Sequence, residues 1–216
     1  MLHRTFHSLG SAVLGLSVAL TAACTQDDAA LPTAAAFSQT AAQTSNADVA
    51  VIADDPSGAG PAIGTVVGSS HLLRTQDGLR AKVRTSGLTP GHIVTLWFVA
   101  FQDPSGCIGA CDNPAEDLGP GRAALAFGGA QHVPPTGSVT IVGRLDVGGE
   151  VVVIDPPPAG DPSADLFDTP IGSEVHLVIR THGPVLPDLL GEQLGSFNGG
   201  CPPNTCASIQ AGVHQP

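Results

Sequence analysis

The sequence predicts an all-β protein, an antiparallel β-sandwich of about seven to eight short strands stapled by disulfides. Short alternating or apolar segments follow one another between Gly, Pro, Asn and Asp from residue 62 onward, and long helical periodicity is absent. Four cysteines in the same region add the expectation of two disulfides. A partly closed β-barrel satisfies the same observations and stays open as the alternative.

Two strands are marked most clearly by their residue pattern. In "LRAKVRTS" (residues 79–86) apolar residues alternate with basic ones, which predicts a half-buried strand with a basic outer face. That face suits either a docking patch for an anionic partner or a solvated strand that discourages edge pairing. "HIVTLWFVAF" (92–101) is apolar on both faces and contains the only tryptophan, which predicts a central strand. The other expected strands lie in residues 64–75, 122–133, 138–147, 174–182 and 207–214, and a helical turn or two is expected within 185–197.

The N-terminal residues predict export and a lipid anchor. "MLHRTFHS" contains Arg4 and no acid, and the apolar stretch that follows is too short to span a bilayer as a helix. The "TAAC" after it resembles a bacterial lipobox, although Thr21 stands where Leu is usual. We expect residues 1–23 to be a signal peptide and Cys24 to carry lipid, with simple cleavage beside an unmodified Cys24 as the alternative. The expected location is the bacterial cell envelope, at the outer membrane or cell surface.

The mature chain divides into a tether and one domain. Residues 24–61 are rich in Ala, Thr, Ser, Asp and Gly, so they are expected to form a flexible acidic tether that buries little apolar surface. Residues 62–216 are long enough for a single domain with its own core. The formal net charge is −11, and this excludes nucleic acid as a partner, because phosphates require a basic face.

The cysteine spacing agrees with an exported protein. Cys107 and Cys111 lie in "CIGAC", and Cys201 and Cys206 lie in "CPPNTC". Four cysteines allow three pairings. Alternating strand directions place the two segments at opposite ends of the fold, which favours the local bridges Cys107–Cys111 and Cys201–Cys206. A redox role for "CIGAC" is weakly supported, because its spacing is not Cys-x-x-Cys and no helix is expected there.

Histidines stand near the ends of expected strands. In "EVHLVIRTHGP" (174–184) alternation places His176 and His182 on one face about 20 Å apart, so the two cannot share a metal ion. We expect His176 to be a surface residue. If successive strands alternate in direction, His214 lies at one end of the fold. The opposite end then collects a set of candidate copper or zinc ligands, His71, His92, His132 and His182, whose other interpretation is solvated strand ends.

One acidic loop is a further candidate for a cation. Asp155, Asp161, Asp165 and Asp168 lie between two expected strands and offer the oxygen ligands that calcium prefers. Their spacing matches no calcium loop, so solvated acids are the expected interpretation.

Two resemblances add to these patterns. "SGLTPGHIVTLWFVAFQDPSGC", "EVHLVIRTHGP" and "SIQAGVHQP" resemble a family of secreted bacterial β-sandwich proteins that has no established activity. "GLTPGH" is also similar to the turn before the copper strand of copper/zinc superoxide dismutases and chordin-type domains, which implies a shared sandwich architecture. That enzyme family requires His-x-His after the turn, whereas apolar residues follow His92 here, so the resemblance does not extend to the dismutase ligands.

The functional expectation follows from the catalytic motifs that the sequence lacks. The sequence contains no Gly-x-Ser-x-Gly elbow, phosphate-binding Gly-Lys-Ser/Thr loop or His-Glu-x-x-His. We therefore expect a binding or structural module of the envelope without a cofactor. Its expected partners are the membrane, through lipid on Cys24, and an envelope protein or glycan. The alternative is a copper- or zinc-binding protein that uses the four strand-end histidines.

Overall fold

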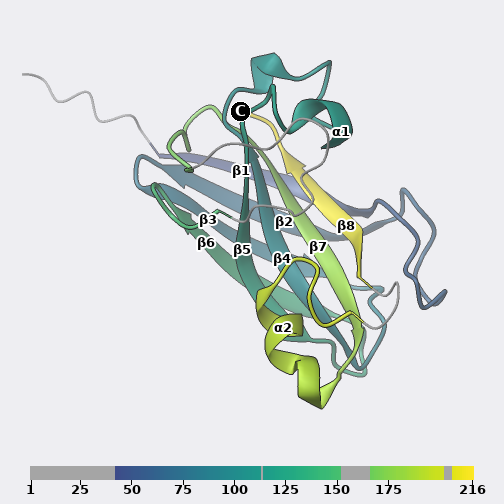
Figure 1. Cartoon of the computed structure of the whole chain (residues 1–216). Coiled ribbons are helices and arrows are strands. Elements are labelled where there is room, and N and C mark those ends of the chain that lie inside the picture. Colours follow the sequence, from purple (N-terminus) through teal and green to yellow (C-terminus); the bar gives the residue numbers. More distant parts are fainter. Residues whose placement is uncertain (1–41, 113, 152–165, 202–205) are drawn as a thin grey trace, which may run out of the picture. The chain divides into compact units, whose positions relative to one another are not determined.

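The computed structural model describes residues 42–112, 114–151, 166–201 and 206–216, which belong to one compact unit (Figure 1). The expected signal peptide and Cys24 lie outside the described residues. The strands are β1 (Gln43–Val51), β2 (Val66–Thr75), β3 (Gly78–Thr85), β4 (His92–Phe101), β5 (Ala123–His132), β6 (Val139–Asp146), β7 (Glu174–Pro184) and β8 (Ala207–His214). The short helical segments are η1 (Pro104–Gly106), α1 (Pro114–Asp117), η2 (Pro187–Leu189) and α2 (Leu190–Gly195). No helix among the described residues is both long and apolar enough to cross a membrane.

The expected all-β antiparallel fold is confirmed. All eight strands belong to one sheet in the order β5-β4-β7-β8-β1-β2-β3-β6, and every pairing is antiparallel. This sheet curls into a nearly closed barrel, the alternative that the sequence left open. Strands β4 and β8 have the bounds expected from sequence, and η2 and α2 supply the helical turns expected within residues 185–197.

The two edge strands, β5 and β6, pack against each other at glycines. A Cβ atom on Gly143 of β6 would lie 3.0 Å from the carbonyl oxygen of Gly128 on β5 and 2.9 Å from the ring of Phe98. Side chains at this seam would therefore force the strands apart. The glycines let the sheet approach closure without a hydrogen-bonded register between its edges.

Strand β1 corrects the expectation that residues 24–61 form a tether. Residues 43–51 lie inside the sheet between β2 and β8. Sequence reasoning missed this strand because its inward positions near one barrel end carry Ser45 and Ala47, and only Val49 and Val51 contribute large buried side chains. The domain therefore begins well before residue 62.

Ser45 is part of a buried polar cluster at that barrel end. Arg74 of β2 is 1% exposed, and its guanidinium donates hydrogen bonds to Ser45 Oγ and to the carbonyl oxygens of Ser173, His214 and Gln215. Several charge-assisted hydrogen bonds thus offset the cost of burying the cation. They also tie the end of β8 to β2 and to the residue before β7.

His214 is buried in the same cluster and is held as a neutral ring. Ser70 Oγ donates to the Ala47 carbonyl, so it accepts from His214 Nε2 at 2.9 Å. Ser45 accepts from Arg74 and donates to His214 Nδ1 at 2.9 Å. Burial, reinforced by the positive charge of Arg74, lowers the pKa of His214 from 6.5 to about 4.

Strand β4 is apolar on both faces, as its sequence predicts. Leu96 and Phe98 pack into the barrel core, whereas Trp97 and Phe101 point to the outer face and are still buried. Since β4 pairs with β5 on one side and β7 on the other, it is an interior strand. The outer face of the β5-β4-β7-β8 half of the sheet is thus a second apolar layer, which positions the candidate site.

Candidate functional site

An apolar pocket, here called the outer pocket, lies on the outer face of β4, β7 and β8. It measures about 430 Å³, within the usual range for small-molecule sites. Alternate strand residues form its floor, which comprises Val99, Val178, Ala211 and Val213. Cys111 and Leu118 line the pocket next to α1, and Phe197, which follows α2, lines it as well. In Figure 1 these two helices lie at opposite ends of the β7 strand.

A small number of polar groups face this pocket. His176 Nε2 lies 2.7 Å from Glu174 Oε1, and the His176 ring packs 5.1 Å from that of Phe101. His176, Asp112 and Ser208 are the polar residues that line the pocket. The expectation that His176 is a surface residue is wrong, because its side chain is 14% exposed. The segment that follows β4 covers this face of the sheet, which sequence alternation alone treats as solvated.

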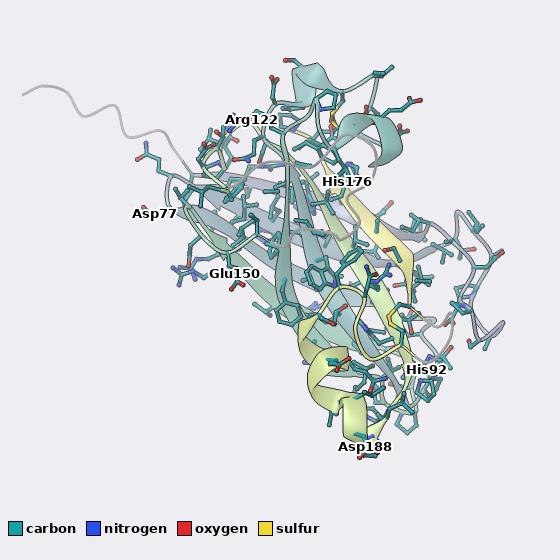
Figure 2. All side chains as sticks on the ribbon, viewed as in Figure 1. Asp77, His92, Arg122, Glu150, His176 and Asp188 are labelled. Atoms are coloured by element: carbon teal, nitrogen blue, oxygen red, sulfur yellow. A yellow bond between two sulfur atoms is a disulfide. The ribbon has the colours of Figure 1, made fainter. Side chains whose placement is uncertain are left out.

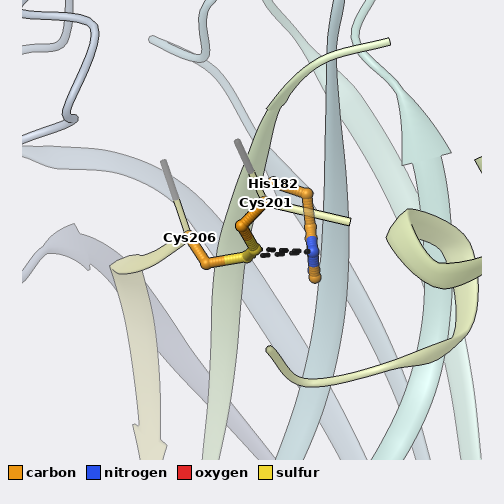
Figure 3. A group of neighbouring side chains, drawn as sticks. All are labelled: His182, Cys201 and Cys206. Atoms are coloured by element: carbon orange, nitrogen blue, oxygen red, sulfur yellow. Dashed lines mark hydrogen bonds between the residues drawn. A yellow bond between two sulfur atoms is a disulfide. The ribbon is translucent and has the colours of Figure 1, made fainter. Parts of the chain in front are cut away.

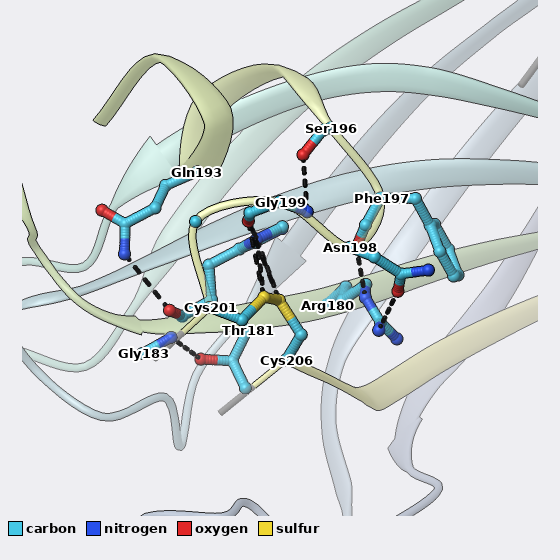
Figure 4. The surroundings of a disulfide bond; sticks show 12 residues. Arg180, Thr181, Gly183, Gln193, Ser196, Phe197, Asn198, Gly199, Cys201 and Cys206 are labelled. Carbon is cyan, nitrogen blue, oxygen red and sulfur yellow. Dashed lines mark hydrogen bonds between the residues drawn. A yellow bond between two sulfur atoms is a disulfide. The ribbon is translucent and has the colours of Figure 1, made fainter. Parts of the chain in front are cut away.

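Phe197 is fixed in the pocket wall by its neighbours (Figure 4). Its ring meets the Trp97 ring edge-on at 5.0 Å, and the Arg180 guanidinium lies 4.2 Å from its centre. Arg180 Nε also donates to the Phe197 carbonyl at 2.7 Å, and its terminal nitrogens donate to Asn198 and Ser208. Arg180 therefore attaches the segment after α2 to β7 and β8.

Beside this wall, a hydrogen-bond chain joins three buried side chains. Trp97 Nε1 donates to Thr95 Oγ1 at 2.7 Å, and Thr95 Oγ1 lies 2.9 Å from His182 Nε2. His182 Nδ1 lies 3.0 Å from the Gly199 carbonyl. Burial lowers the pKa of His182, an effect that the Gly199 carbonyl opposes and the charge of Arg180 reinforces. His182 is therefore a neutral ring held from both sides.

The structure confirms the two local disulfides, Cys107–Cys111 and Cys201–Cys206. The first borders the outer pocket through Cys111. The second packs against His182, whose Nδ1 lies 3.3 Å from Cys206 Sγ (Figure 3). These three residues are the one group of three His, Cys, Asp or Glu side chains within the described ranges whose donor atoms all lie within 4.8 Å of one another. Because a disulfide sulfur is no longer a thiolate, such a group binds a metal only after reduction.

The strand-end histidines are partly where the sequence placed them. His92 opens β4, His132 closes β5 opposite Ile93, and His182 lies near the end of β7, so these three share one barrel end. His214, opposite Val175, lies at the other, as predicted. The expectation for His71 is wrong, because this residue lies in the middle of β2 opposite Lys82.

The histidines at that shared barrel end do not form a metal group among the described residues. His182 is buried against the disulfide, His92 contacts the Thr181 hydroxyl at 3.4 Å, and His132 is exposed. Figure 2 shows His92 toward the α2 end and His176 toward α1. Burial lowers the pKa of His92, against an opposing effect of Asp55.

Two other candidate sites receive little support. Asp155, Asp161 and Asp165 lie outside the described residues, while Asp168 forms an exposed ion pair with Arg122 at 3.3 Å. The basic outer face of β3 is confirmed, since its basic side chains are exposed. Neighbouring strands add His71 and Arg144 to that face, but Arg144 is itself bonded to Asp146.

The fold and the pocket together define a class of protein, a disulfide-stapled antiparallel β-barrel with a small-molecule-sized apolar pocket on its outer face. Comparison of the chain with protein-family models, with curated proteins and with solved structures finds no match. Its function is therefore argued from its own residues.

Proposed function

We propose that this chain is an exported, lipid-anchored cell-envelope protein that acts as a non-catalytic binding module and holds a small neutral apolar molecule in the outer pocket. The observation that carries the proposal is the pocket itself, because most of the side chains that line it are apolar. A cavity of this size and lining favours hydrophobic ligands and uses a few polar groups to orient them. Asp112, Ser208 and His176, which Glu174 holds, supply such groups.

The charge of the protein narrows the ligand class. Asp112 lines the pocket, Glu174 bonds to the lining residue His176, and the whole chain carries a formal charge of −11. An anionic ligand would be repelled, whereas a neutral one meets no such penalty. A glycan is disfavoured because its many hydroxyl groups would lie against valine, leucine and phenylalanine side chains and lose hydrogen bonds to water.

The export part of the proposal rests on the N-terminal pattern and on the disulfides. Disulfides persist in oxidising compartments such as the bacterial periplasm and cell surface. Both bridges also border the segments that enclose the outer pocket. Covalent stapling therefore supports a preformed pocket in a compartment where thiols are oxidised.

The competing proposal, a copper or zinc protein, has weaker support. The four histidines named from sequence are not gathered as one ligand group within the described residues, and the His182 group has its sulfurs tied in a disulfide. Elemental analysis of the oxidised chain after exposure to copper and zinc and dialysis distinguishes the two. We expect no bound metal, and one equivalent per chain would favour the metalloprotein.

Binding of N-phenyl-1-naphthylamine, a neutral apolar fluorophore, tests the pocket. The oxidised chain should bind about one equivalent with enhanced fluorescence. Val213→Asp places a charge in the pocket floor and should weaken binding about tenfold or more, because the ligand must desolvate that carboxylate. Val142→Asp is the matched control, since Val142 is an exposed valine on β6, outside the pocket. Equal binding by both variants, or none by the wild type, would contradict the proposal.

A further inference from the structure

The two disulfides of the protein have different surroundings. His182 Nδ1 lies 3.3 Å from Cys206 Sγ and 3.8 Å from Cys201 Sγ (Figure 3). Among the described residues, no histidine hydrogen-bonds to the sulfurs of Cys107–Cys111, and Cys111 Sγ contacts the Pro104 carbonyl instead. The loops that the two bridges close are nearly equal in length, with sequence separations of 4 and 5. Cys107–Cys111 is therefore an internal control for the effect of His182 on a disulfide.

The proton of the neutral His182 ring is on the nitrogen that faces the sulfurs. A carbonyl oxygen only accepts hydrogen bonds, so the contact with the Gly199 carbonyl requires the proton on Nδ1. The other nitrogen, Nε2, accepts from the Thr95 hydroxyl, whose oxygen already receives the Trp97 N–H. These contacts fix the tautomer, and they place the Nδ1–H, which donates to the Gly199 carbonyl, on the nitrogen that lies 3.3 Å from Cys206 Sγ.

An N–H group in this place has little effect on a disulfide and a large effect on a thiolate. A thiolate accepts a strong hydrogen bond from a nearby donor, which lowers the pKa of its thiol. A thiol of lower pKa is also the better leaving group when a disulfide is attacked. Cys206 Sγ is the sulfur nearer to His182 Nδ1, so the histidine favours departure of Cys206.

We propose that Cys201–Cys206 is a thiol-exchanging disulfide, in which an incoming thiolate attacks Cys201 and Cys206 leaves as a thiolate stabilised by His182. This role is separate from ligand binding in the outer pocket. Both cysteines are half-buried rather than enclosed, and the exchange requires that a small thiol reach Cys201 Sγ. The co-reactant is a low-molecular-weight thiol or an exposed cysteine of another envelope protein.

The exchange balances in two steps. The thiolate sulfur of the co-reactant forms a bond to Cys201 Sγ, the bridge to Cys206 breaks, and its electron pair stays on Cys206 Sγ. A second thiolate then attacks the co-reactant sulfur of this mixed disulfide and releases Cys201 as a thiolate, which takes a proton from solvent. In total, two thiols are oxidised to one disulfide, and the protein disulfide gains two electrons.

Charged groups near the bridge act in both directions. On β7, Arg180 hydrogen-bonds to the Phe197–Asn198 segment and favours a thiolate (Figure 4). On α2, the Glu192 carboxylate accepts from the Gly200 amide, next to Cys201, and disfavours one. The Glu192 carboxylate bonds to the residue before Cys201, and His182 lies nearer Cys206, so both differences favour the same leaving group.

The first test compares the two bridges in the unmodified protein. The full-length oxidised chain is equilibrated in buffers of increasing reduced-to-oxidised glutathione ratio and quenched with acid. Alkylation and peptide mass spectrometry then give the reduced fraction of each pair. We expect Cys201–Cys206 to be half reduced at a ratio about tenfold or more below that for Cys107–Cys111. Equal midpoints, or the reverse order, would overturn the proposal.

The second test assigns the leaving sulfur. Cys201→Ser leaves Cys206 alone, and Cys206→Ser leaves Cys201 alone, so the pH dependence of iodoacetamide alkylation reports each thiol separately. Cys206 should reach half its maximal rate about one pH unit or more below Cys201. Adding Thr95→Val to Cys201→Ser retains the imidazole but removes the hydroxyl that fixes its tautomer, and it should reduce this difference. Identical pH profiles for Cys206 and Cys201 would contradict the assignment.

Discussion

The buried histidine at the end of β8 predicts a specific dependence of stability on acid. His214 is 1% exposed, and its pKa falls from 6.5 to about 4 on folding, because burial and the charge of Arg74 disfavour protonation. The unfolded chain therefore binds a proton between these two pH values and the folded chain does not. The contribution of the neutral His214 ring to the free energy of unfolding is fully present above pH 6.5. It declines as the pH falls through this window and changes no further below about pH 4.

The size of the effect follows from the same two values. At pH 5 the unfolded histidine is almost fully protonated and the folded one mostly neutral, so linkage gives a loss of about 2 kcal/mol relative to pH 7.5. At pH 4 the loss grows to about 3 kcal/mol. A loss of this size is a large part of the free energy of unfolding of an ordinary domain, which is roughly 5–15 kcal/mol.

Urea unfolding of the oxidised chain at pH 7.5 and 5 measures this loss. His214→Asn removes the titrating group, so the stability difference between the two pH values should be about 2 kcal/mol smaller in this variant than in the wild type. The comparison uses a difference between two pH values, so a lower baseline stability of the variant does not affect it. His132→Asn, at an exposed histidine, should behave like the wild type. Equal pH dependence in the wild type and His214→Asn would show that His214 is not the source of the acid sensitivity.

Three further predictions concern the barrel and its anchor. Gly143→Ala should destabilise the protein by about 1–3 kcal/mol in urea unfolding, because the new methyl group meets β5 and the ring of Phe98, whereas Gly191→Ala, in open space, should not. Gln102→Leu should cost about 2–4 kcal/mol, since the buried amide bonds four backbone groups, and the exposed Gln131→Leu should cost little. Cys24→Ser should move the protein from the membrane fraction to the soluble fraction in cell fractionation, and retention in the membrane would contradict the expected lipid anchor.

The sequence predicts most of the barrel because strand periodicity depends on local residue choice. Alternation in β3 and the doubly apolar β4 identify one half-exposed strand and one interior strand, and both are confirmed. β1 escapes detection because two of its inward positions carry the small residues Ser45 and Ala47. The role of these small residues is apparent only in the folded structure, where β2 brings Arg74 and β8 brings His214 beside them.

The candidate site is less accessible to prediction, because segments far apart in sequence build it. The apolar outer face of β4 is a usable signal, since an apolar outer face must be covered. The sequence does not show what covers it, because the covering residues come from separate parts of the chain. Leu118 precedes β5, and Phe197 follows β7. The approach of His182 to Cys206 depends in the same way on the path of the chain after α2. Pairing within each cysteine segment is predictable, because strand direction alone separates the two segments.

Methyl-resolved NMR of the oxidised chain, titrated with N-phenyl-1-naphthylamine, shows where on the barrel a neutral apolar ligand binds. Ring-current shifts report which valine methyl groups lie beside the bound aromatic probe. We expect saturable shifts at Val99, Val178 and Val213, which line the outer pocket, and none at the exposed Val142 on β6. Shifts centred on Val142, or no saturable shift at the three pocket valines, would contradict the proposal that this protein binds a neutral apolar ligand on the outer face of its barrel.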